Sequence, residues 1–255
     1  MMTTPGFTAE LPEQGEPEVG QELIRIRYDD GRQEELRLHD YARLYSVPGL
    51  YEQIVHDQLQ CRSPEQLAGM LARAADELGW ERDRVRVIDL AAGNGMSGEA
   101  LANRGLRPVL GTDIVAAARE AALRDRPGVY DAYETLDLLA LTPEQRRALA
   151  AYNANALSCV APVGSASQQL PPAVLTAVIA LLAPDALIAY LHDPTFGVPD
   201  PITPELLRDQ LGDGLRTAQL ERRRYVHRRT VSGRPYEMEG VILRVTRPDP
   251  GAAAP

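Results

Sequence analysis

The sequence contains no lysine, so all 27 of its basic side chains are arginines. This absence excludes a Schiff-base mechanism, a lysine general base and a phosphate loop of the G-x-x-x-x-G-K-[ST] type, because each needs the ε-amine. Positive charge is also in the minority, since 36 acidic residues give a net charge of −9. An acidic surface repels phosphodiesters, so we expect no broad nucleic-acid-binding surface.

Cysteine and long apolar segments are equally scarce. The two cysteines, Cys61 and Cys159, belong to no Cys-x-x-Cys or Cys/His cluster, so we expect neither a metal site nor a disulfide scaffold. The longest apolar run, near residues 174–182, is too short to cross a bilayer, and the first 20 residues lack the features of a signal peptide. We therefore expect a cytoplasmic protein that does not contact membranes.

The 255 residues are 44% hydrophobic and 25% charged, which is typical of one large globular domain with additions. Residues 1–20 and 248–255 are rich in proline and glycine without periodicity, so we expect disordered tails there. Between them we expect an N-terminal segment with a helical cap over 21–80 and a larger ligand-binding domain over 81–247.

The cap is predicted from a helical pattern over residues 36–80. Ser63-Pro64-Glu65-Gln66 is typical of a helix start, with Ser63 as the N-cap, Pro64 at the first helical position and Gln66 closing a capping box.

From residue 85 the chain alternates short aliphatic runs with helical segments, which is typical of a parallel sheet covered on both faces. The expected strands are 85–90, 108–113, 130–135, 154–160 and 186–192. The expected helices are 97–104, 116–123, 143–150, 172–182 and 204–211. Residues 216–231 and 236–246 then predict an antiparallel hairpin. The fold class is α/β: a Rossmann-like, doubly wound, seven-stranded mixed sheet with an antiparallel C-terminal hairpin and a helical N-terminal cap.

A glycine-rich turn follows the first of these strands, in Val87-Ile-Asp-Leu-Ala-Ala-Gly-Asn-Gly-Met-Ser-Gly98. Its Gly93-x-Gly95-x-x-Gly98 spacing matches the dinucleotide fingerprint, a pattern with many false positives. However, Asp89 and three further residues precede the first glycine. A carboxylate directed into the turn would repel a diphosphate and would suit a ligand with ammonium and sulfonium groups.

The segment Asp89-Leu-Ala-Ala-Gly93-Asn-Gly95 resembles the first motif of class I S-adenosylmethionine-dependent methyltransferases, usually D/E-x-G-x-G-x-G, with Ala91 in place of the first glycine. The resemblance implies that Asp89, Ala91, Gly93 and Gly95 bind S-adenosylmethionine as the cofactor.

Later strand ends continue the resemblance. It implies that Asp113 accepts hydrogen bonds from the ribose hydroxyls and that Ile114 packs against the adenine. Asp113 could instead cap the next helix. Asp137 and Leu138 are implied to contact the adenine, and Cys159 is expected to be a small buried residue near the cofactor rather than a nucleophile.

The fourth predicted strand lacks the Asp/Asn-Pro-Pro-Tyr motif of amino-methylating nucleic-acid enzymes, which argues against base methylation. Residues 41–52 and 156–160 are similar to small bacterial methyltransferases of the Williams–Beuren-region type, whose substrates are mostly unassigned. We expect methyl transfer to a small-molecule acceptor. The acceptor, the methylated atom and the oligomeric state stay open.

Two residues are candidates for catalysis. His192 follows the fifth predicted strand and could take a proton from the acceptor, although such a residue is more often a polar boundary residue. Tyr45, with Tyr41 and Tyr51, could close over the methyl donor or could simply anchor the cap to the sheet.

Other interpretations stay open at this stage. The arginines at 222–224 and 228–229 could bind an anion, but a solvated hairpin edge is favoured. A nicotinamide-dependent oxidoreductase would use the same sheet, although Asp89 and the absence of a separate substrate domain argue against it. A cofactor-binding module without catalysis fits the lack of an obvious general base equally well.

Overall fold

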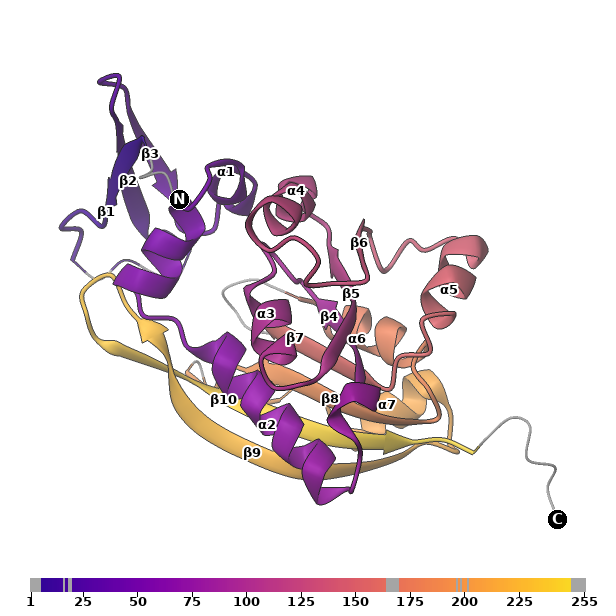
Figure 1. The fold of residues 1–255 in the computed structure, drawn as a ribbon. Helices are drawn as coiled ribbons and strands as arrows, with labels where there is room; N and C mark the ends of the chain where they lie inside the picture. Colours follow the sequence, from indigo (N-terminus) through magenta and orange to yellow (C-terminus); the bar gives the residue numbers. More distant parts are fainter. Residues whose placement is uncertain are drawn as a thin grey trace, which may run out of the picture.

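The computed structural model describes residues 6–15, 17, 20–163, 170–195, 197, 199–200 and 202–248. Its centre is a seven-stranded sheet with the order β6-β5-β4-β7-β8-β10-β9 (Figure 1). The strands are β4 (Arg86–Leu90), β5 (Arg107–Asp113), β6 (Ala132–Thr135), β7 (Ala156–Pro162), β8 (Asp185–His192), β9 (Arg216–Arg229) and β10 (Pro235–Thr246). The first five run parallel, and β10 pairs antiparallel with both β8 and β9. The predicted fold class and hairpin are confirmed.

Helices cover both faces of this sheet. They are α2 (Ser63–Glu77), α3 (Met96–Ala102), α4 (Ala116–Asp125), α5 (Pro143–Ala150), α6 (Pro172–Ile179) and α7 (Pro204–Leu211). Thr142 caps α5 in a complete capping box, and Thr203 caps α7.

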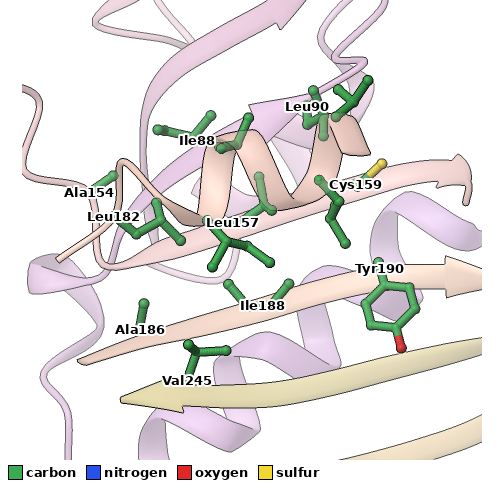
Figure 2. Close-up of a cluster of buried hydrophobic side chains, with 14 of the residues drawn as sticks. Ile88, Leu90, Ala154, Leu157, Cys159, Leu182, Ala186, Ile188, Tyr190 and Val245 are labelled. Carbon is green, nitrogen blue, oxygen red and sulfur yellow. The ribbon is translucent and has the colours of Figure 1, made fainter. Parts of the chain in front are cut away.

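Alternate residues of each central strand enter different cores, because neighbouring side chains of a strand point to opposite faces. On one face Ile88, Leu157 and Ile188 lie on adjacent strands, and they pack with residues of α5, α6 and α7 (Figure 2). On the other face the preceding residues, Val87, Ala156 and Leu187, pack against α2 and α3. Both faces of the sheet are therefore closed to ligands, and its strand ends are left for binding.

The first turn of α2 differs from the prediction. Arg62 is the N-cap residue, and Ser63 is the first helical residue, with no side-chain capping bond. The Ser63 hydroxyl is instead fully buried and pairs with His227 Nδ1 at 2.7 Å. A tertiary hydrogen bond to the distant hairpin thus replaces the local capping bond that the sequence suggests. The helix packs on the large sheet, so the cap ends before residue 63.

Residues before α2 form a separate small unit, here called the N-terminal module (the described residues of 6–62). It contains a three-stranded antiparallel sheet in the order β1-β2-β3, followed by two helices. The elements are β1 (Phe7–Glu10), β2 (Leu23–Tyr28), β3 (Gln33–Arg37), α1 (Tyr41–Ser46) and the π-helix η1 (Glu52–Gln58). Its core is formed by Ile24, Ile26, Leu44, Leu50 and Ile54, all inaccessible to solvent.

Two sequence predictions are therefore wrong in the N-terminal module. The expected disordered tail over 1–20 contains β1, whose Phe7 and Ala9 are buried, while residues 1–5, 16, 18 and 19 lie outside the described residues. The expected helical pattern from residue 36 begins within β3. The signals that were missed are the alternation of Ile24 and Ile26 and the Asp30-Gly31 turn, where Gly31 has φ +87°. Of the C-terminal tail, residues 249–255 lie outside the described residues.

The C-terminal hairpin connects the two units. Only Glu239–Thr246 of β10 pairs with β8, so the hairpin extends past the carboxyl end of that strand. There the N–H of Arg62 donates to the His227 carbonyl at 2.9 Å, and the N–H of Arg229 donates to the Leu59 carbonyl at 2.6 Å. The hairpin tip thereby holds the N-terminal module over the carboxyl ends of the parallel strands (Figure 1). Within the described part of the chain, no helix is both long and apolar enough to span a membrane.

Candidate functional site

A cavity of about 330 Å³ lies between the parallel strands and the N-terminal module. One side, here called the sheet wall, comes from the strand ends and the loops that follow them: Ala91, Ala92, Gly93, Asn94, Asp113 and Ile114. The other side, the cap wall, comes from the module and the hairpin tip: His39, Tyr41, Tyr45, His227, Arg228 and Tyr236. Its position at the carboxyl ends of parallel strands is the usual ligand position in open α/β sheets.

The glycine-rich loop has the conformation that its composition requires. Gly93 and Gly95 have φ values of +54° and +87°, in the left-handed region that favours glycine. A Cβ atom on Gly93 would overlap the hydroxyl oxygen of Tyr45. Ala91 is also left-handed, at φ +53°, which costs about 1 kcal/mol for a residue with a side chain. The loop therefore tolerates alanine at this position at the expense of local strain.

Asp113 is the last residue of β5, and its carboxylate connects the glycine-rich loop with the loop that follows β5. Its Oδ2 accepts the Gly93 N–H at 3.0 Å, and its Oδ1 accepts the Val115 N–H at 2.9 Å. Partial burial raises the pKa of its carboxyl group, and the backbone hydrogen bonds act in the opposite direction. A carboxylate offers about four acceptor positions, so part of this capacity stays available for a ligand beside the backbone N–H groups of Gly93, Val115 and Ile114. The next residue, Ile114, lines the cavity with a side chain that is 69% exposed.

Asp89 lies under the loop rather than in it. Its carboxylate accepts hydrogen bonds from the Ser97 hydroxyl and from the Tyr130 hydroxyl, the latter at 2.6 Å, and is fully buried. Its Oδ1 has no partner among the described residues, and burial raises its pKa to about 6. Asp89 is not among the described residues that line the cavity. The expected direct repulsion of a diphosphate by this side chain is therefore wrong.

The third glycine of the fingerprint spacing has a packing role. A Cβ atom on Gly98 would overlap the ring of Tyr130, whose hydroxyl reaches Asp89. The G-x-G-x-x-G match is thus explained in part by the approach of an aromatic ring to α3.

Three tyrosines stand beside the loop. The rings of Tyr41 and Tyr45 are stacked with centroids 5.8 Å apart, and the Tyr45 and Tyr51 centroids are 5.0 Å apart. Tyr45 also packs against alanines of α4, so it both anchors the cap and lines the cavity. Burial, followed by the neighbouring Tyr51, raises the pKa of Tyr45 well above its usual value. Tyr45 therefore stays a neutral phenol, which can donate a hydrogen bond but is a poor general base.

The remaining predicted residues lie outside the described cavity lining. Gly95 packs under Arg126 and Tyr130, Leu138 and Cys159 are buried in the core, and burial raises the pKa of the Cys159 thiol. Asp137 is exposed and accepts the Leu139 N–H at 3.0 Å. His192 is 5% exposed and faces Glu239 across the β8–β10 pair. The structure thus brings Tyr45, Ala91, Gly93, Asp113 and Ile114 to one cavity, and the roles of the others stay predictions.

Several cap-wall residues were missed by sequence reasoning. Arg228 was interpreted as part of a solvated edge, but it is 5% exposed and pairs with Glu22 at 2.7 Å. His227 and Cys61 also line the cavity. No local pattern marks these residues, because the ion pair joins positions 206 apart in the chain. Within the described residues, no group of three or more histidine, cysteine, aspartate or glutamate side chains could hold a metal ion.

Solved structures resemble this chain, whereas no protein-family model and no curated protein matches it. An S-adenosylmethionine-dependent methyltransferase from Anabaena variabilis ATCC 29413 aligns over 84% of this chain and 96% of its own, with 16% identity and a TM-score of 0.52. A magnesium protoporphyrin IX methyltransferase from Synechocystis PCC 6803 aligns over 73% and 80%, with 18% identity and a TM-score of 0.44.

The alignment covers nearly the whole length of the Anabaena enzyme. The strand order, with β4 central and an antiparallel hairpin at one edge, agrees with that likeness. The narrower resemblance to the Williams–Beuren-region group stays a prediction. The protein has the fold of class I S-adenosylmethionine-dependent methyltransferases.

Proposed function

We propose that the protein transfers a methyl group from S-adenosylmethionine to a small-molecule acceptor. The observation that supports this most directly is the position of Asp113, whose carboxylate lines the cavity beside the glycine-rich loop and keeps acceptor positions free. The ribose hydroxyls of the cofactor are suitable donors for those positions.

The residues of the sheet wall fit this cofactor in size and chemistry. The cavity volume falls in the range of sites for small ligands and cofactors. Gly93 lets the loop lie close to Tyr45 at the edge of the cavity, and the exposed Ile114 side chain offers an apolar surface for the adenine. When bound, S-adenosylmethionine supplies an electrophilic methyl group on a sulfonium that is already a good leaving group.

The protein's own contribution is then positioning and exclusion of water. The N-terminal module covers the strand ends, so an acceptor between the two walls is held in a restricted volume. Tyr45 would orient polar groups as a hydrogen-bond donor, because its raised pKa keeps it protonated. His192 is not among the described residues that line the cavity, so this proposal gives it no role.

Calorimetric titration with S-adenosylmethionine and, separately, with NADH tests the proposal. We expect micromolar binding of S-adenosylmethionine by the wild-type protein, and at least tenfold weaker binding by Asp113→Ala, equivalent to about 1.4 kcal/mol. Asp209→Ala changes an exposed carboxylate on α7 and should bind as the wild type does. Binding of NADH instead would favour the oxidoreductase, and binding of neither ligand would reject both cofactors.

A further inference from the structure

The cap wall contains a buried cation that faces the cavity. The Arg228 guanidinium donates from Nη2 to Glu22 at 2.7 Å and from Nη1 to the Arg229 carbonyl at 3.0 Å. A guanidinium has five N–H donors, so others remain. Glu22 is not among the described residues that line this cavity and instead borders a smaller one on the other side of Arg228. On the cap wall, Arg228 is therefore the charged side chain that a ligand meets.

His227 is a second donor, and it lies next to Arg228 both in the sequence and in the cavity. The Tyr225 hydroxyl donates to the Ser63 hydroxyl at 3.1 Å, and Ser63 Oγ lies 2.7 Å from His227 Nδ1. Nδ1 therefore faces two groups that carry a proton, the Ser63 hydroxyl at 2.7 Å and the Cys61 thiol at 3.9 Å, and we infer that it accepts from them. The proton of the neutral imidazole is then on Nε2.

His227 stays neutral near pH 7 because burial, followed by the adjacent Arg228 charge, lowers its pKa to about 3. Its Nε2 has no hydrogen-bond partner among the described residues, and the residue lines the cavity. The relay from Tyr225 through Ser63 thus presents an imidazole N–H as a donor beside the Arg228 cation.

We propose that the methyl acceptor is an organic carboxylate whose carboxylate group is bound by Arg228 and His227. This inference rests on the proposed function. One cation beside one neutral donor suits a monoanion better than a phosphate dianion. The surrounding Leu38, Val55, Leu59 and Met238 suit an apolar body. Asp113 places a carboxylate on the opposite wall, which disfavours an anion there and orients the acid toward the cap wall.

Matched probe pairs test the assignment. The protein saturated with S-adenosylhomocysteine is titrated with benzoate and benzamide, and with hexanoate and hexanamide. In at least one pair we expect the acid to bind at least tenfold more tightly than its amide. Equal binding within both pairs, or tighter binding of phenyl phosphate than of benzoate, would overturn the proposal.

Variants test whether Arg228 and His227 cause the preference for the acid over its amide. In Glu22→Gln/Arg228→Met both partners become neutral, so no unpaired charge is left in the interior, and we expect the preference for the acid to disappear. His227→Phe keeps a ring and removes the N–H, and should reduce the preference about threefold. Arg224→Met is the matched control, because this arginine lies on the same strand with its side chain 55% exposed, and its preference should equal that of the wild type. A preference that persists in the double variant contradicts the assignment.

Titration with S-adenosylhomocysteine alone separates the two proposals and also reports folding of each variant. If the wild-type protein does not bind it, the proposed function fails, and the acceptor assignment falls with it. If it binds and acid and amide bind equally, only the carboxylate assignment fails.

Discussion

The two walls of the cavity are built in different ways. The sheet wall consists of a few residues at the ends of β4 and β5, and its polar groups are backbone atoms and one carboxylate fixed by backbone N–H groups. The cap wall is assembled from side chains of the N-terminal module and the hairpin, which are joined by long-range contacts such as Glu22 to Arg228. A function that depends on the first wall can be inferred from a short motif, whereas one that depends on the second needs the folded chain.

Among the tests of this difference between the two walls, we expect the largest effect at the glycine-rich loop. Gly93→Ala adds left-handed strain and an overlap with the Tyr45 hydroxyl, so we expect a loss of roughly 4 kcal/mol in the free energy of unfolding. Gly128→Ala is the matched control, because φ is +78° there but no atom lies near the added Cβ. It should lose only about 1 kcal/mol by urea denaturation. Equal losses in the two variants would show that the contact between the walls at Tyr45 is unimportant.

Asp89 provides the next test, beneath the sheet wall. Its pKa is raised to about 6, so the folded protein holds this proton more tightly than the unfolded chain does. The contribution of Asp89 to stability is then present at low pH and is lost as the pH rises from about 4 to 6.

Asp89→Asn cannot ionise, so we expect its stability relative to wild type to increase between pH 4 and pH 8 by up to about 3 kcal/mol. Denaturation at several pH values measures this difference. A difference that does not change with pH would mean that Asp89 titrates normally in the folded protein.

Tyr225 supports His227 of the cap wall through Ser63, and Tyr225→Phe removes the hydrogen bond to Ser63 and should cost about 1 kcal/mol of stability. In this variant, His227 should no longer prefer the tautomer that carries its proton on Nε2. Nitrogen NMR distinguishes the two tautomers. Tyr152→Phe serves as the control, because its hydroxyl makes no hydrogen bond to the described residues. An unchanged His227 tautomer in Tyr225→Phe would contradict the relay.

We expect the smallest effect at Asp137, which follows β6. Asp137 is exposed, and a hydrogen bond to an exposed carboxylate contributes little against water. We expect Asp137→Ala to weaken binding of S-adenosylmethionine about threefold, equivalent to roughly 0.6 kcal/mol. Weakening greater than in Asp113→Ala would place the main cofactor contact after β6 rather than after β5.

Sequence reasoning predicted the large sheet because its strands are short aliphatic runs whose periodicity is independent of the rest of the chain. It also placed Gly93 in a tight turn and Asp113 at the end of a strand, since both are local features. It failed where tertiary contacts override local pattern. Ser63 exchanges a capping role for a bond to His227, and Arg228 is buried against a residue 206 positions away.

The structure of the protein bound to S-adenosylhomocysteine tests most directly whether the sheet wall binds the cofactor and leaves the cap wall to the acceptor. We predict ribose hydroxyls within hydrogen-bond distance of the Asp113 carboxylate, the adenine against Ile114, and no ligand atom in contact with Arg228. An adenosyl group bound to Arg228 and His227, with Asp113 bonded only to Gly93 and Val115, would contradict the account.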